Sequence, residues 1–197
     1  VDTAAAVALE FRDERIRPNR VESSLGVAGG RNFLMEQSRG EILVVIDDDA
    51  VLVADSALKQ VWRAFERWTD AAAIAFRVTN VICGQRTQNL PFSKAHLRHQ
   101  PTIVQSPAKV SYYVGCGHAI RRSFVQEHGG YRSDMKFGAE ELDLAYRIIQ
   151  AGRSIVYDPA VEVEHFPMPS VVDGNGRPEA TELYCYMRNR AYLAYRY

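Results

Sequence analysis

Two kinds of hydrophobic pattern alternate along this chain of 197 residues. Continuous apolar runs predict strands, whereas apolar residues recurring every three or four positions predict helices. The most continuous apolar run, residues 42–46, follows a glycine and indicates a strand buried on both faces of a parallel sheet. Strands are predicted over 21–23, 41–46, 71–81, 110–114, 154–157 and 161–164, and helices over 3–15, 33–39, 56–68, 122–127, 140–151 and 179–197.

The order of these elements indicates the fold class. Strands alternate with helices through the first half of the chain, which is typical of an α/β fold. The length allows one domain, which we expect over residues 1–178, with the helix over 179–197 as its last part or as an extension. The polar segment 83–109 contains three prolines and predicts a long, partly irregular excursion of the kind that often carries binding function.

Composition limits the kinds of binding partner and the cellular compartment that we expect for this protein. Lys and Arg number 24, as do Asp and Glu, so the formal net charge is +0 and no nucleic-acid partner is expected. The three cysteines are scattered without zinc-type spacing, which favours a reducing compartment. No segment is apolar enough to span a bilayer, and no signal peptide is visible. We therefore expect a cytoplasmic location, including the surface of the cytoplasmic membrane.

The strongest candidate for chemistry is the acidic run Asp47-Asp48-Asp49 directly after the strand over 42–46. Ligands of α/β sheets bind beyond the carboxyl ends of the strands. In an extended backbone Asp47 and Asp49 would point to the same side and converge on one cation, or on a cation and a sugar hydroxyl. Their mutual repulsion favours a hard divalent cation with oxygen ligands, although a solvated acidic turn is the alternative.

Two further candidates lie downstream. Glu140, Glu141 and Asp143 open a predicted helix, where the helix dipole favours acids whatever their function, and where one of them could serve as a general base. His165 ends the strand over 161–164. A single histidine is more often structural than a ligand, but a neutral imidazole suits a cation that aspartates already hold.

Glycines mark two places where a ligand could approach the backbone. The stretch 26–32 precedes a predicted helix and would favour an anion, but the G-x-G-x-x-G spacing of dinucleotide-binding proteins is absent. Gly115-Cys116-Gly117 follows a predicted strand and could form a bulge, a turn or the wall of a cleft.

One enzymatic alternative starts from the same aspartates. Residues 46–52 also resemble the strand-end motif of haloacid-dehalogenase-like phosphatases, in which the first Asp is a nucleophile and magnesium is bound. That family needs a later strand ending in Gly-Asp or in paired aspartates, and no such motif follows here.

Taken in order, these motifs resemble those of the GT-A nucleotide-sugar glycosyltransferases of family 2. No single motif is decisive, but their joint occurrence, with agreeing order and spacing from about residue 2 to residue 165, is specific. The matching segments are 25–32, 40–49, 117–122, 129–131, 137–147, 151–152 and 164–165.

This resemblance implies a GT-A fold, with a mostly parallel central sheet flanked by helices and a first strand that is missing before residue 1. It implies inverting, metal-dependent transfer of a hexosyl or deoxyhexosyl group from a nucleoside-diphosphate sugar to a hydroxyl of a glycan, a lipid-linked acceptor or a small molecule. The absence of a Gln-x-x-Arg-Trp motif favours a non-processive enzyme. A catalytically inactive sugar-nucleotide-binding protein of the same fold is the alternative from a different class.

The resemblance also implies roles for individual residues. Asp49 would be the principal ligand of Mn²⁺ or Mg²⁺, Asp47 would contact the metal or the ribose, and His165 would complete the metal site. Glu141 falls at the position of the catalytic base, which is usually Asp in this family, and Asp143 matches a supporting acid. Contact with the nucleotide is implied for Asp2, Gly26, Asp47, Asp48 and Gly117.

Overall fold

A computed structural model describes residues 6, 9–11, 13–167 and 180–197. Asp2 and part of the helix expected over 3–15 therefore lie outside the described residues. The elements in chain order are α2 (Gly26–Gln37), β1 (Ile42–Ile46), β2 (Ala50–Leu52), α3 (Ala57–Arg67), β3 (Ala71–Ile82), β4 (Gln85–Asn89), α4 (Lys94–His99), η1 (Pro101–Gln105), β5 (Ala108–Val110), β6 (Gly117–Arg121), α5 (Arg122–His128), η2 (Ser133–Met135), α6 (Glu140–Gln150), β7 (Ser154–His165) and α7 (Ala180–Arg196).

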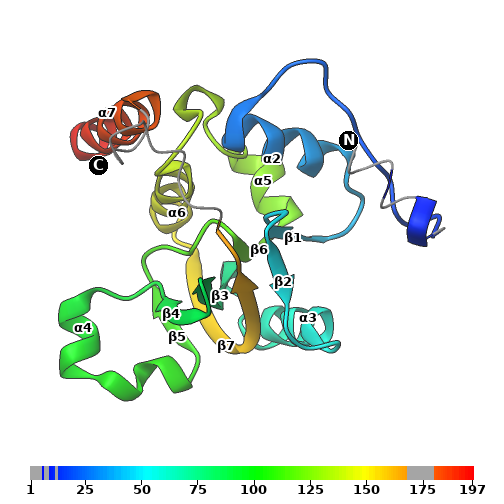
Figure 1. Ribbon diagram of the computed structural model, residues 1–197. Helices are drawn as coiled ribbons and strands as arrows, with labels where there is room; N and C mark the ends of the chain where they lie inside the picture. The colour runs from blue at the N-terminus through cyan, green and yellow to red at the C-terminus, as the bar shows by residue number, and fades with distance from the viewer. Residues whose placement is uncertain (1–5, 7–8, 12, 168–179) are drawn as a thin grey trace.

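The described strands form one seven-stranded sheet with helices on both faces (Figure 1). Its main path runs β1-β6-β3-β7-β2, while β4 pairs with β3 and β5 pairs with β7. The α/β fold class is confirmed, but the sheet is not mostly parallel in its pairing. Only β3 and β7 pair in parallel, and the other five pairings are antiparallel. Strands β1 and β3 still share one direction, because β6 runs antiparallel to both of them.

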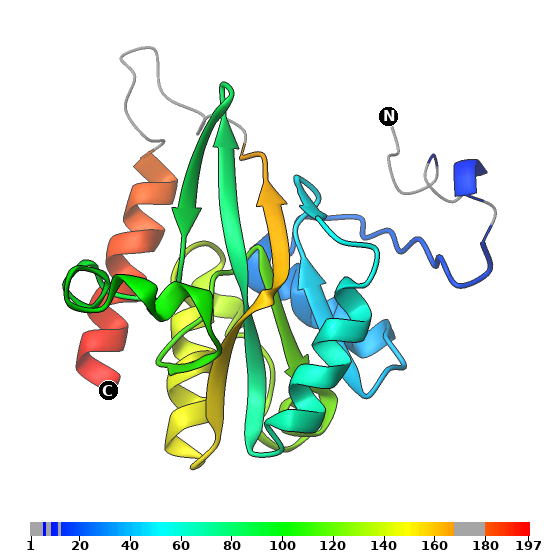
Figure 2. The ribbon, with the colours of Figure 1, turned by 90° about the horizontal axis from the view of Figure 1, so that it is seen from below.

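The two faces of the sheet have separate cores. Helix α3 covers one face, where Val61 and Phe65 pack against the strands. Helices α2, α5 and α6 lie on the other face, in a cluster that includes Phe124 and Leu144 (Figure 2). Every residue over 71–76 of β3 is fully buried, because this central strand is covered on both faces.

Strand β1 differs from its expected environment. We expected the apolar run over 42–46 to be buried on both faces, yet Leu43 is the only buried residue in it and Ile46 is 38% exposed. In the described part of the chain β1 pairs with β6 alone, so its second edge is open. A continuous apolar run predicts a strand but does not identify its neighbours.

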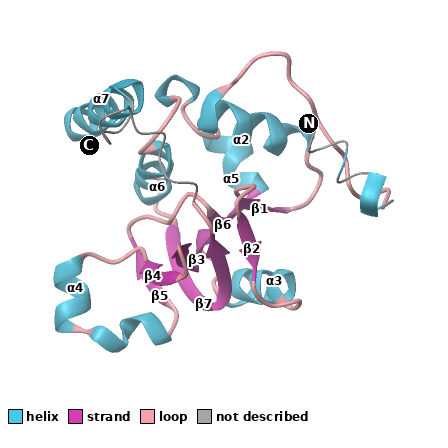
Figure 3. Cartoon of the chain, viewed as in Figure 1, coloured by secondary structure: helices cyan, strands magenta, loops and turns pink. Residues whose placement is uncertain are grey.

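Several expected boundaries moved (Figure 3). Residues 21–23 are not a strand, and the strand expected over 110–114 is replaced by β5 and β6 on either side of a loop. The excursion over 83–109 is more ordered than expected, since it contains β4, α4, η1 and β5. The two short strands expected near 154–164 are one strand, β7, because a register shift against β3 accommodates the segment around Pro159.

Helix α2 contains the glycines that we expected to precede it. It begins at Gly26 and includes Gly29 and Gly30, so the interpretation of these residues as an anion-binding loop before a helix is wrong. Gly26 has a φ of +67°, and a Cβ there would lie 2.9 Å from the carbonyl oxygen of Lys136. Only glycine permits this close approach without strain. The next residue, Val27, donates its backbone N–H to the same oxygen at 2.9 Å.

A second contact fixes α2 to the loop after α5. The carboxamide of Asn32 accepts a hydrogen bond from the backbone N–H of Tyr131 at 2.8 Å and donates one to the Tyr131 carbonyl at 2.7 Å. A Cβ on the preceding Gly130 would lie 2.4 Å from Asn32 Oδ1. The Arg-Asn and Gly-Gly-Tyr motifs are therefore in direct contact.

Helix α7 packs near the start of α6. Asn189 is buried and its side-chain amide donates to the carbonyl oxygens of Met135, Phe137 and Gly138 at 2.7 to 3.0 Å. Leu193 packs in a small cluster with Met135. Among the described residues, no helix has the length and apolar character needed to cross a membrane.

Candidate active site

A tight turn, and not an extended backbone, brings Asp47 and Asp49 together. The N–H of Ala50 donates to the Asp47 carbonyl at 3.1 Å, and the N–H of Phe166 donates to the Asp49 carbonyl at 2.7 Å. Strand β2 then pairs with β7, which places Ala50 opposite His165. One ligand atom from each of Asp47, Asp49 and His165 lies within 4.8 Å of the others. The three expected metal ligands thus converge.

The orientation of His165 is set by a residue that sequence reasoning missed. Its Nδ1 lies 3.0 Å from Oδ1 of Asn80, which stands opposite it in the β3–β7 register. With Nδ1 donating to this oxygen, Nε2 keeps a lone pair and faces Asp49 Oδ1 at 3.2 Å. Two carboxylates and one imidazole suit Mn²⁺ or Mg²⁺, so the donor set fits the implied cation.

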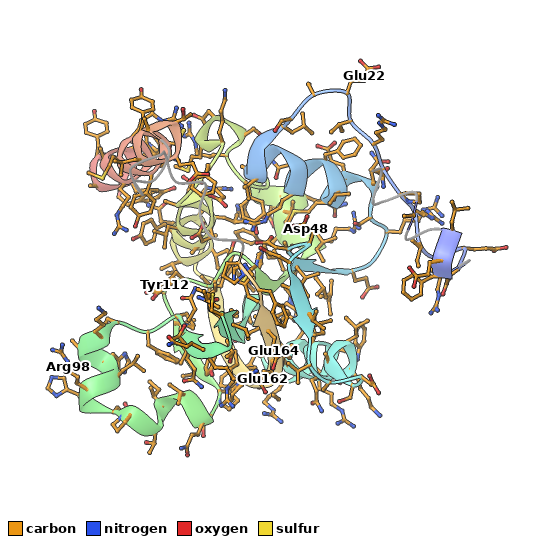
Figure 4. The ribbon with its side chains drawn as sticks, in the orientation of Figure 1. Glu22, Asp48, Arg98, Tyr112, Glu162 and Glu164 are labelled. Carbon is orange, nitrogen blue, oxygen red and sulfur yellow. The ribbon has the colours of Figure 1, made fainter. Side chains whose placement is uncertain are left out.

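Three further acidic side chains come from the same two segments, the turn between β1 and β2 and strand β7. Asp48 is exposed at the turn between β1 and β2 (Figure 4). Glu164 pairs with Arg86 of β4, and Glu162 precedes it by two residues on the same strand. Contact of Asp48 with a nucleotide stays a prediction.

Arg31 connects the acidic turn to helix α6. This side chain of α2 is 9% exposed, with Nη2 at 2.8 Å from Asp47 Oδ1 and Nη1 at 3.0 Å from Glu140 Oε1. A Cβ on Gly115 would lie 3.2 Å from Nη2, so glycine at this position leaves room for the guanidinium. No sequence pattern predicts the Arg31–Glu140 contact, because the two residues are 109 positions apart.

Glu140 and Glu141 differ in environment although they are adjacent. Glu140 is 4% exposed and its Oε2 has no hydrogen-bond partner among the described residues. Glu141 is partly exposed. Burial, reinforced by the charge of Glu140, raises the pKa of Glu141 to about 7. A carboxyl group with a pKa near neutrality is suited to accept a proton as a general base.

Asp143 has both carboxylate oxygens occupied. Arg147 Nε donates to Oδ2 at 2.9 Å, and the Tyr197 hydroxyl donates to Oδ1 at 3.1 Å. Arg147 also donates to the carbonyl oxygens of His128 and Gly129. These contacts explain why an acid is needed here for structure, and a role for Asp143 in catalysis stays a prediction.

A buried aromatic group lies beside Arg31. The ring of Tyr113 stacks on His118 with centroids 4.3 Å apart, and the Tyr131 hydroxyl forms a hydrogen bond with His118 Nε2. Arg31 lies 5.6 Å from the centroid of the Tyr131 ring. Burial lowers the pKa of His118 well below its usual value, which keeps the imidazole neutral.

Packing explains why glycine is needed at the two positions predicted to bind the nucleotide. A Cβ on Gly117 would lie 3.1 Å from Val163 Cγ2 and 3.3 Å from Val78 Cγ2, inside the core. Gly26 is required by its approach to Lys136. Nucleotide contact by either glycine stays a prediction, and Asp2 is outside the described residues.

Solved GT-A glycosyltransferases share the fold of this chain. The chain is 14% identical to GalNAc-T7, a structure with UDP, GalNAc and Mn²⁺, with a TM-score of 0.66 over 83% of this chain and 34% of that one. The mannosyltransferase PcManGT of Pyrobaculum calidifontis, in complex with GDP-Man and Mn²⁺, is 18% identical, with a TM-score of 0.59 over 83% of this chain and 43% of that one. S. aureus TarS is 15% identical, with a TM-score of 0.62 over 86% of this chain and 30% of that one.

Sequence comparison gives the family. Residues 1–129 match the model of glycosyl transferase family 2, and the chain belongs to this family. An uncharacterized protein of Haemophilus influenzae is 31% identical over 109 residues, which are 54% of this chain and 56% of that protein. The chain therefore spans about half the length of the curated relative that it matches. Family membership also argues against the phosphatase alternative.

Proposed function

We propose that this domain transfers a hexosyl or deoxyhexosyl group from a nucleoside-diphosphate sugar to an acceptor hydroxyl, with inversion and without processive polymerisation. The observation that carries the proposal is the joining of two groups of acids by Arg31, which contacts Asp47 on one side and Glu140 on the other. The candidate metal ligands therefore lie near the first turn of α6, which carries Glu141, the candidate base of raised pKa.

Asp47, Asp49 and His165 would hold Mn²⁺ or Mg²⁺. When bound, the cation supplies positive charge that stabilises the departing diphosphate. Asn80 would keep Nε2 of His165 available by accepting the Nδ1 proton. The solved structures of GalNAc-T7 and PcManGT, which contain Mn²⁺ with UDP and GDP-Man respectively, support such a site.

Glu141 would act as the base. The acceptor oxygen forms its bond to the anomeric carbon while the bond from that carbon to the diphosphate breaks, and the acceptor proton passes to the Glu141 carboxylate. A single displacement of this kind inverts the anomeric configuration. The pKa of about 7 leaves a substantial fraction of Glu141 ionised at neutral pH.

We also propose the residues that contact the nucleotide, the class of acceptor and the cellular location. Asp2, Gly26, Asp48 and Gly117 are the proposed nucleotide contacts beside Asp47. The acceptor would be a glycan, a lipid-linked molecule or a small molecule, and the proposed location is the cytoplasm, including the surface of its membrane.

The proposal is tested by measuring the binding of nucleoside diphosphates with Mn²⁺ and with a chelator. We expect tight binding only with Mn²⁺, because the acidic cluster repels the diphosphate without a cation, and we expect Asp49→Ala to abolish the difference. Equal affinities in the two conditions would contradict a metal-dependent donor site. Binding of the sugar nucleotide without any turnover would instead support a catalytically inactive binding protein.

A further inference from the structure

Arg31 is a cation placed directly against a proposed metal ligand. Its Nη2 lies 2.8 Å from Asp47 Oδ1, while its Nη1 lies 3.0 Å from Oε1 of the buried Glu140. The guanidinium is confined by Gly115, where even a methyl group would approach to 3.2 Å. Its position between the two carboxylates is therefore fixed by packing as well as by charge.

This position gives Arg31 two opposite electrostatic effects on the acidic turn. In the protein without a divalent cation, Arg31 offsets the repulsion among the aspartates. A divalent cation at Asp47 must however accommodate the positive charge of Arg31 beside it, so the same guanidinium opposes metal binding.

Glu140 contacts the other nitrogen of the Arg31 guanidinium and so affects the charge near Asp47. It is 4% exposed, and Arg31 is the only hydrogen-bond partner that the described residues give its carboxylate. A buried carboxylate strongly retains such a partner, because losing it leaves an uncompensated charge. The negative charge of Glu140 therefore offsets part of the positive charge that Arg31 presents to Asp47, which favours a cation at Asp47.

We propose that Arg31 and Glu140 are positioning residues that set the metal affinity of the site by opposing effects on Asp47. Arg31 lowers the affinity for the divalent cation, and Glu140 raises it by engaging Arg31. Neither residue is required to touch the metal. This inference rests on the proposed metal site at Asp47, Asp49 and His165, and adds a control of its affinity that runs through helices α2 and α6.

The test is a calorimetric titration of the full chain with Mn²⁺ alone, at low ionic strength, where electrostatic effects are least screened. We expect Arg31→Gln to bind Mn²⁺ about fivefold or more tightly than the wild type, and Glu140→Gln to bind it more weakly by a similar factor. A loss of affinity in Arg31→Gln, or an unchanged affinity in Glu140→Gln, would overturn the inference.

The double variant separates an effect through Arg31 from a direct effect of the Glu140 charge. If Glu140 acts through Arg31, the combined Arg31→Gln and Glu140→Gln variant binds Mn²⁺ like Arg31→Gln alone. An affinity well below that of Arg31→Gln would show a direct effect and contradict the proposed route. Should Arg31→Gln fail to fold because Glu140 is left unpaired, Glu140→Gln still decides, since its amide oxygen can accept from Arg31.

Two controls keep this inference distinct from the proposed function. Asp49→Ala tests the metal site itself, and Mn²⁺ binding unaffected by that change would refute the site as a whole. If Asp49→Ala abolishes binding while the Arg31 and Glu140 variants bind like the wild type, only the present inference fails. Lys109→Gln removes an exposed ion pair with Asp70 beside the opposite end of the long strands, and should leave Mn²⁺ affinity unchanged.

Discussion

At the scale of single residues, the two neighbouring glutamates of α6 illustrate what sequence can and cannot show. Glu141 was predicted as the base from the family motif, and its raised pKa fits that role. Glu140 looked like an ordinary first-turn acid, for which the helix dipole is explanation enough. Its burial and its contact with Arg31 could not be predicted, because they depend on how α2 packs near α6.

The proposed role of Glu141 as the base leads to a kinetic prediction. Because proton transfer occurs in the transition state, Glu141→Gln should lower kcat by about a hundredfold to ten-thousandfold and leave donor affinity nearly unchanged. Asp143→Asn should have a smaller effect, since Asp143 is held by Arg147 and Tyr197. Steady-state assays at saturating donor compare the two variants. Near wild-type turnover in Glu141→Gln would refute Glu141 as the base. A large loss of kcat in Asp143→Asn alone would instead indicate that Asp143 is the base.

At the scale of elements, three of the helices in the middle of the chain were the most predictable. Helices α3, α5 and α6 lie within a residue or two of their expected ranges. Strand β6 was missed because Gly117-His118-Ala119 has the composition of a loop, although all three residues are buried between β1 and β3. Because β6 is buried on both faces, its sequence lacks the alternation of apolar and polar residues that identifies a half-exposed strand.

The attachment of α7 allows a prediction about stability. Replacing Asn189 by Ala removes hydrogen bonds to three carbonyl oxygens in the segment before α6. Unsatisfied buried acceptors are costly, so we expect a loss of about 2–4 kcal/mol in the free energy of unfolding. Arg196→Ala, at an exposed position of the same helix, should change stability by less than about 0.5 kcal/mol. Denaturant unfolding measures both, and equal effects would contradict a specific anchoring role for Asn189.

At the scale of the whole molecule, the site depends on segments that are distant in the chain. Arg31 of α2, Asp47 after β1, Glu140 of α6 and His165 of β7 meet beyond the ends of the strands. The sequence allowed the fold class to be predicted, and also the convergence of the three candidate metal ligands, since ligands of α/β sheets bind at the strand ends. The strand order and the connection through Arg31 required the structure, because no local pattern encodes pairing between distant elements.

The pKa of Glu141 predicts opposite pH trends for activity and stability. The base must be ionised, so kcat/KM should rise as pH increases through about 7. In the folded protein this pKa lies above the 4.5 of a glutamate in the unfolded chain, so the folded state binds more protons between those two pH values. The contribution of Glu141 to stability is therefore greatest at low pH and falls as pH rises toward 7, by about 1.4 kcal/mol for each unit of pKa difference.

This pH prediction is checked by following kcat/KM and unfolding of the wild type from below pH 4.5 to above pH 7, with Glu141→Gln as the reference for unfolding. Other carboxylates titrate in both proteins, so the difference between their stabilities isolates Glu141. The wild type should lose stability relative to the variant as pH rises through 7. A difference that is independent of pH would show that Glu141 has an ordinary pKa.

The contact between Asn32 and the Gly130-Tyr131 backbone has a consequence for recombining family members. A chimera that takes α2 from one protein and the loop after α5 from another would join halves that had not been matched to each other. Any side chain at position 130 would meet the Asn32 carboxamide, where a Cβ would come within 2.4 Å of Oδ1. Crossover points between residues 32 and 130 should therefore favour folded chimeras when the parent that supplies α2 carries this asparagine and the parent that supplies the loop carries this glycine.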